Sequence, residues 1–125
     1  MESVNATALY NEAKQYLNVV KVLHKKKKFN TQTLGNIACM AAEGLMVSYM
    51  SKFNKLPNHH SLDFLIKEIA KMKPDIPNSL VEDVFFLEEF QNLCVIENIG
   101  MKIPKDEEID RIVNILVALD ATLFS

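Results

Sequence analysis

The amino-acid sequence predicts an all-α fold, an up-and-down bundle of four long helices and one short helix. Apolar residues recur three and four positions apart along most of the chain, which is the spacing of one helix face. Residue types that favour helices are plentiful, whereas the chain has only three Gly and four Pro. With 125 residues, 49% of them hydrophobic, the chain is expected to form a single domain over residues 1–125.

The first helix is expected from about Ser3 to Lys28. Its buried face is predicted to contain Ala6, Leu9, Tyr10, Ala13, Leu17, Val20 and Leu23. Its last turn is cationic, as the carbonyl end of a helix favours, through His24, Lys25, Lys26, Lys27 and Lys28.

A second helix is predicted from Thr31, as its N-cap, to about Lys55, and Glu43 is the only charge between Leu34 and Ser51. One apolar stripe comprises Leu34, Ile37, Ala38, Ala41, Leu45 and Tyr49, and another comprises Cys39, Ala42, Met46, Met50 and Phe53. Small residues, Gly44 among them, would let a neighbouring helix approach closely. A helix with two apolar stripes is either the centre of the bundle or shared with a second copy of the chain.

The remaining helices follow from turn and cap signals. Pro57 ends the second helix, and Ser61 is expected to cap the short third helix, whose apolar face is Leu62, Leu65, Ile66 and Ile69. Ser79 and Glu82 have the spacing of a capping box, which predicts a fourth helix continuing to about Asn98.

The last helix is predicted after two residues that break helices, Gly100 and Pro104. Acidic residues favour the first turn of a helix, and three of them follow directly at 106–108. The expected buried face, which reaches the end of the chain, is Ile109, Ile112, Val113, Leu116, Leu119 and Leu123.

The net charge of −2 is unevenly distributed along the chain. Residues 1–60 contain eight lysines against three acids, and residues 61–125 contain six basic residues against thirteen acids. This asymmetry could attract subunits or partners to each other, or the two halves could neutralise each other within one bundle.

Several classes of protein are disfavoured by what the sequence lacks. No apolar run approaches the roughly 20 residues that span a bilayer, and the N-terminus has no secretory pattern, so we expect a cytoplasmic protein that does not bind membranes. Cys39 and Cys94 lack metal-site spacing and are expected to be small core residues. The glycines are isolated, which excludes a glycine-rich phosphate loop, and we expect no cofactor and no metal.

Three polar features are candidates for binding. Glu43 must be hydrogen-bonded, paired or turned to water, so it either makes a structural bond to a Tyr, His or backbone group or lies beside a pocket. His59 and His60 have no third metal ligand nearby in sequence, so one of them is expected to pack or cap near the third helix. Lys25, Lys26, Lys27 and Lys28 are either a solvated helix end or a contact for phosphates.

Two segments carry a resemblance to a known family. Residues 41–50 read Ala-Ala-Glu-Gly-Leu-Met-Val-Ser-Tyr-Met, and Leu56-Pro57 precedes a segment at 60–65 that reads His-Ser-Leu-Asp-Phe-Leu. This pattern resembles the HEPN superfamily of helical domains, in which an Ala-Glu pair is followed six residues later by an aromatic residue or Leu, here Tyr49. A Pro and a His-x-Leu then lead into a short third helix. Residues 104–108 look like the family's last turn, so the similar layout covers about residues 5–124.

The HEPN resemblance implies an up-and-down bundle that usually forms dimers. Some members are RNA-cleaving toxins, others pair with small nucleotidyltransferase proteins, and some are non-catalytic. The nuclease members carry an Arg followed four to six residues later by a His, but here Arg111 is the only arginine and no His follows His60. In addition, Gly44 and Val47 stand where relatives commonly have lysines.

The sequence therefore predicts a non-catalytic HEPN-like interaction module that forms a homodimer, with a nucleotidyltransferase protein as an expected partner. Its candidate binding residues are Glu43, Tyr49, His60 and Lys25 to Lys28. The alternatives are a divergent ribonuclease acting through His59, His60, Glu43 and these lysines, and a module that binds nucleotides or another small ligand near Glu43 and Tyr49.

Overall fold

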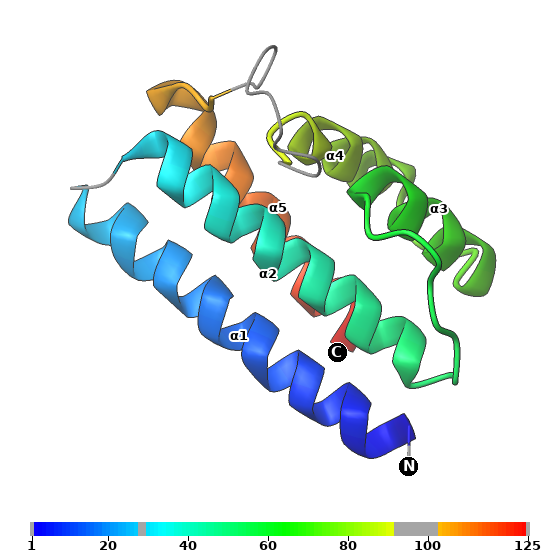
Figure 1. Cartoon of the computed structure of the whole chain (residues 1–125). Coiled ribbons are helices and arrows are strands. Elements are labelled where there is room, and N and C mark those ends of the chain that lie inside the picture. Colours follow the sequence, from blue (N-terminus) through cyan, green and yellow to red (C-terminus); the bar gives the residue numbers. More distant parts are fainter. Residues whose placement is uncertain (1, 28–29, 92–102, 125) are drawn as a thin grey trace.

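The computed structural model of the chain describes residues 2–27, 30–91 and 103–124, and these ranges contain helices joined by loops and turns but no strand. The prediction of an all-α bundle is thereby confirmed (Figure 1). The elements are α1 (Glu2–Lys26), α2 (Thr31–Ser51), α3 (Leu62–Met72), α4 (Asn78–Glu88), a single 3₁₀ turn η1 (Asp106–Glu108) and α5 (Ile109–Phe124).

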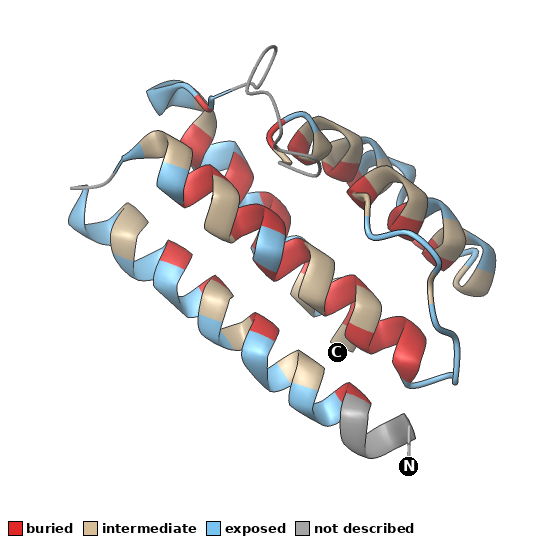
Figure 2. Cartoon of the chain, in the orientation of Figure 1, coloured by how far each residue is buried: buried red, intermediate tan, exposed pale blue. Residues whose placement is uncertain are grey.

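Helix α2 is the centre of the bundle. It packs against α1, α3 and α5, and α4 packs against α3 and α5 (Figure 1). Of its two apolar stripes, all members but Ile37 and Phe53 are buried, and Ile37 is half-buried. Figure 2 shows buried residues along α2 beyond its first turn. Its unusual hydrophobicity is therefore explained by neighbours within the same chain.

Close packing of α1 on α2 depends on Gly44. A Cβ atom added to Gly44 would lie 2.8 Å from the Cβ of Ala13, which is closer than two carbon atoms can approach. The backbones of the two long helices can therefore come together only because a residue without a side chain faces a small one. This contact confirms the expected role of the small residues in α2.

Several helix ends differ from the sequence prediction. Asn30, not Thr31, caps α2, because its Oδ1 accepts hydrogen bonds from the backbone N–H groups of Gln32 and Thr33 at 2.8 and 3.2 Å. The helix stops at Ser51 rather than Lys55. Beyond this end, Asn54 adopts a left-handed conformation with φ of 61°. The backbone N–H of Lys55 donates to the carbonyl oxygen of Met50, as in a Schellman motif.

The N-terminal ends of α3 and α4 also lack the side-chain caps that the sequence predicted. Ser61 is the N-cap of α3, but the N–H of Leu62 donates to Oε1 of Gln91 at 3.0 Å, so a side chain from beyond α4 replaces the serine. Helix α4 begins at Asn78 after Pro77 and has no side-chain cap, so the Ser79–Glu82 capping box was wrong. Helix α4 ends at Glu88. The predicted continuation from residue 92 to Asn98 lies outside the described residues, together with Cys94 and Gly100. Lys28 and Phe29 also lie outside them.

Polar contacts tie the basic N-terminal half to the acidic C-terminal half. Nζ of Lys14 in α1 lies 2.8 Å from Oδ2 of Asp120 in α5, and Tyr10 donates to Oδ1 of the same carboxylate at 3.0 Å. His24 and Asp110 join the same two helices with a 2.5 Å contact. Part of the charge asymmetry is thus neutralised inside the bundle. Within the described ranges, no helix combines the length and the apolar character needed to cross a membrane.

Candidate functional site

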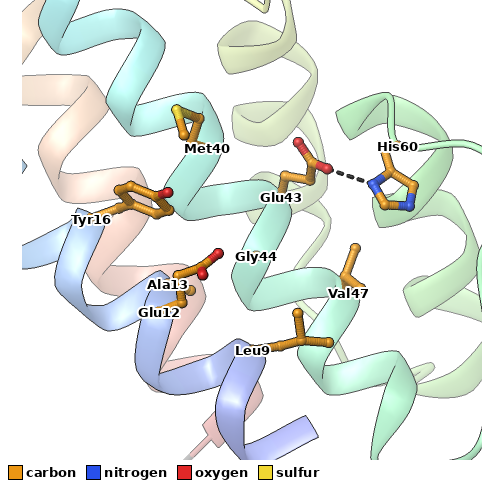
Figure 3. A pocket seen from close by; sticks show the side chains of 9 residues that line it. All are labelled: Leu9, Glu12, Ala13, Tyr16, Met40, Glu43, Gly44, Val47 and His60. Carbon is orange, nitrogen blue, oxygen red and sulfur yellow. Dashed lines mark hydrogen bonds and ion pairs between the residues drawn. The ribbon is translucent and has the colours of Figure 1, made fainter. Parts of the chain in front are cut away.

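A hollow of about 180 Å³ lies between α1 and α2, next to the loop before α3 (Figure 3). Gly44 and Ala13, which form the close contact between the two helices, both line it. Its lining combines apolar and polar side chains: Leu9, Glu12, Ala13, Tyr16, Met40, Glu43, Gly44, Val47 and His60.

The polar centre of this hollow is a contact between Glu43 and His60. Oε2 of Glu43, on α2, lies 2.5 Å from Nδ1 of His60, in the loop before α3 (Figure 3). The side chains are 32% and 50% exposed, so the pair is open to water on one side. The contact explains how a carboxylate is tolerated in an otherwise uncharged stretch of helix. Both sequence hypotheses for Glu43 therefore apply, since it makes a structural bond and also lines a pocket.

The loop that carries His60 is fixed by Gln91. The Gln91 side chain donates from Nε2 to the carbonyl oxygen of His60 at 3.0 Å and accepts from the N–H of Leu62 at 3.0 Å. These two bonds hold the backbone on both sides of Ser61. Because Nδ1 of His60 bonds to Glu43, Nε2 is the ring nitrogen that remains to bind a ligand or a partner.

A second hollow of about 390 Å³ continues from the first. The two share Leu9, Val47 and His60, and the second is completed by Ala8, Ser51, Leu56 and Pro57. Together they form one groove, called here the α1–α2 groove, which runs from Tyr16 and Met40 to Leu56. Its walls are largely apolar, and its polar groups are concentrated near Glu43.

The other predicted site residues lie elsewhere. Tyr49 is buried on a different face of α2, where its ring centroid lies 5.2 Å from that of Phe53 and 6.2 Å from that of Phe124. His59 packs edge-to-face against Phe64 at 5.3 Å. Neither Tyr49 nor His59 lines the α1–α2 groove.

The lysines at the end of α1 are far from the groove. Lys25 follows Tyr16, the groove residue of α1 nearest to it in sequence, by nine residues, which is about 14 Å at the helical rise of about 1.5 Å per residue. Lys25, Lys26 and Lys27 are exposed, and Lys28 lies outside the described residues. The structure therefore brings Glu43 and His60 together but does not bring the described lysines to them.

Glu12 and Tyr16 are groove residues that the sequence analysis missed. They are four residues apart on α1, beside Ala13, and so share the helix edge that borders α2. Their spacing was visible in the sequence, but the pairing of α1 with α2 was needed to place them in a site.

Metal and thiol chemistry have little support in the described part of the chain. It contains no group of three His, Cys, Asp or Glu side chains that could hold a metal ion. Cys39 is buried, and its Sγ lies 3.6 Å from the carbonyl oxygen of Leu87. Burial, with smaller contributions from the charges of Glu88 and Glu43, raises the pKa of the Cys39 thiol to about 12. A thiol with this pKa is a poor nucleophile at neutral pH.

Comparison with known proteins does not identify a relative: no protein family, curated protein or solved structure matches this chain. The groove is therefore interpreted from its own residues and their chemistry.

Proposed function

We propose that the chain is a non-catalytic, HEPN-like interaction module that forms a homodimer and binds a second protein in the α1–α2 groove. The observation that carries this proposal is the groove itself, an apolar channel with a Glu–His pair at its centre. Apolar walls favour the burial of a partner's side chain, and a few fixed polar groups set its orientation.

Exposed apolar side chains around the groove support a protein partner. Met40 is 45% exposed beside Tyr16, and Leu56 is 79% exposed at the opposite end. Single exposed apolar residues are ordinary on a protein surface, but here they extend an apolar channel at both ends. A partner that covers Leu56 together with Val47 and Leu9 would bury a continuous apolar strip.

The charges of the groove indicate what the partner carries. Glu12 and Glu43 are acidic, and Nε2 of His60 can accept or donate a hydrogen bond. An apolar side chain flanked by a lysine or arginine would match this lining. A phosphate would meet two carboxylates, which repel it.

A nucleotidyltransferase protein is the partner that the HEPN resemblance implies. Glu43 and His60, which belong to the segments carrying that resemblance, both line the groove. The proposed partner therefore binds a surface that contains residues of the HEPN-like segments.

Two measurements test the proposal. Light scattering on the purified protein at micromolar concentration is expected to give a dimer, and a strict monomer would contradict the homodimer. Affinity purification from the native cell is expected to recover a nucleotidyltransferase protein. Val47→Lys, inside the groove, should abolish this recovery, whereas Val117→Lys, on an exposed site of α5, should not. Recovery of RNA in place of protein would overturn the proposed partner.

A divergent ribonuclease is the second candidate, and the Glu43–His60 contact is the observation that favours it. A carboxylate bonded to one imidazole nitrogen orients the ring so that the other nitrogen can act as a base. Such cleavage also needs a cation near the developing charge, and the predicted candidates, the lysines at the end of α1, do not line the groove. The enzyme hypothesis predicts cleavage of single-stranded RNA that is lost in His60→Ala, and an intact protein that leaves RNA uncut would exclude it.

A further inference from the structure

The outward side of α1 carries an apolar stripe in which Val19 and Val22 are exposed and the flanking Tyr16 and Leu23 are half-buried against the core. It consists of Tyr16, Val19, Val22 and Leu23, which are spaced at three and four residues. Val19 and Val22 are 43% and 49% exposed, and together with Asn18 and Leu23 they line a shallow hollow of about 230 Å³. This face lies beside Met40 of α2, which borders Tyr16 in the α1–α2 groove.

The stripe has opposite charges at its two ends. Glu12 lies seven residues before Val19, and Lys26 lies seven residues after it. Residues seven apart differ by only about 20° around a helix, so the three share one face. Both charged residues are exposed, and among the described ion pairs none uses either of them.

The stripe and its two charged ends can pair with the same stripe of a second copy that runs in the opposite direction. A twofold interface joins the same patch on both subunits, so each residue must suit its symmetry mate. If two copies of α1 pack antiparallel with Val19 at the twofold axis, Glu12 faces Lys26 of the second copy. Tyr16 then lies opposite Leu23 of the second copy, because these two residues lie about 60° and 40° to the same side of Val19 around the helix. The aromatic ring can contact the apolar hollow there.

The opposite arrangement is unfavourable. In a parallel pair the two Glu12 carboxylates would meet, and so would the two Lys26 ammonium groups, and like charges in contact repel. Antiparallel packing gives two opposite-charge contacts instead. The charges therefore select both the orientation and the register of the pair.

We propose that the homodimer forms through antiparallel packing of α1 on α1 of the second copy, centred on Val19. This inference rests on the proposed homodimer and adds its surface and register. The second copy covers only the end of the α1–α2 groove at Tyr16 and Met40, and the part around Glu43, His60 and Leu56 stays open to the partner protein.

A charge swap tests the register. Glu12→Lys and Lys26→Glu each replace two opposite-charge contacts per dimer with like-charge contacts, so each should weaken the dimer by about 3- to 30-fold in sedimentation equilibrium. The double variant restores the opposite charges and should return to within about threefold of the parent dissociation constant. If the double variant is weaker than either single one, the register is wrong.

A crosslink tests the axis. In a Cys94→Ser background, Val19→Cys should form a disulfide-linked dimer under mild oxidation, because each introduced thiol faces its own symmetry mate. Val117→Cys is the matched control, since Val117 is 42% exposed but lies on α5, and it should stay monomeric on a non-reducing gel. A dimer in light scattering without the Val19→Cys crosslink overturns the α1 interface and leaves the homodimer intact. A strict monomer in light scattering overturns both.

Discussion

Nδ1 of His60 lies 2.5 Å from Oε2 of Glu43, across 17 residues of sequence. This contact fastens the loop before α3 to the middle of α2 and leaves the second ring nitrogen of His60 for other partners. The same two side chains line the α1–α2 groove, so one interaction both supports the fold and shapes the candidate site. Its strength can be measured separately from the function of the groove.

A double-mutant cycle of Glu43→Ala and His60→Ala should give a coupling energy of about 0.2–1 kcal/mol in urea unfolding at neutral pH. The value is small because both side chains are partly exposed to water. The same cycle with Glu107→Ala in place of Glu43→Ala is the control, since Glu107 is an exposed acid in η1. Coupling energies that are equal in the two cycles would show that the pair does not form in solution.

Gly44→Ala should destabilise the protein although alanine is the better helix former. Alanine gains up to about 1 kcal/mol in helix propensity, whereas overpacking a rigid contact costs about 1–3 kcal/mol. The new methyl group would lie 2.8 Å from the Cβ of Ala13, which cannot rotate away. Thermal and urea unfolding measure the net effect.

Ala13→Gly in the Gly44→Ala background is the control. It removes the methyl group of α1 that the new methyl group on α2 would contact. It should recover part of the lost stability, despite the low helix propensity of glycine. If Gly44→Ala alone is as stable as the parent, α1 moves away at little cost and the contact is not limiting.

The helices were predictable because each of them buries at least one periodic apolar face, and this signal is local. Their ends were less predictable. The left-handed turn at Asn54 and the contact of Gln91 with Leu62 depend on the backbone beyond the helix and on a side chain 29 residues away. The capping box expected at Ser79 had the correct residue types, but the helix begins at Asn78, one residue before the serine, with Pro77 as its N-cap.

Individual residues of the site were predictable from the sequence, but the contact between them was not. Glu43 and His60 each stood out in sequence, Glu43 as a lone charge and His60 within a histidine pair. Their contact depends on the loop that returns across α2, and no local pattern specifies that path. Tyr49 was a natural candidate as the aromatic residue six positions after Glu43, but six residues rotate a helix by about 240°, which directs its side chain to another face.

Asp120→Asn should loosen the attachment of α5 to α1. The carboxylate accepts hydrogen bonds from both Tyr10 and Lys14, and the amide can keep only part of this arrangement. The expected loss is about 1–2 kcal/mol of unfolding free energy. The bond to Asp120 also raises the pKa of the Lys14 ammonium group, so this substitution should lower that pKa in an NMR titration. An unchanged pKa of Lys14 would contradict the contact.

Cys39 should make the protein less stable at alkaline pH. Its pKa is raised from 9.0 to about 12, chiefly by burial, so above pH 9 the unfolded chain loses the thiol proton while the folded chain keeps it. The unfolded state then binds fewer protons, and the free energy of unfolding falls as pH rises, with a slope that approaches about 1.4 kcal/mol per pH unit. Unfolding in urea between pH 8 and 10.5 measures this slope.

Cys39→Ala, in a Cys94→Ser background, removes this titration and should flatten the fall in stability, although the cavity lowers stability at every pH. The parent with Cys94→Ser alone is the control, and its Cys39 should react with a thiol reagent at pH 8 only about as fast as the protein opens. Rapid labelling of the folded control, with the same slope in both variants, would show that Cys39 is accessible and ionises near its ordinary pKa.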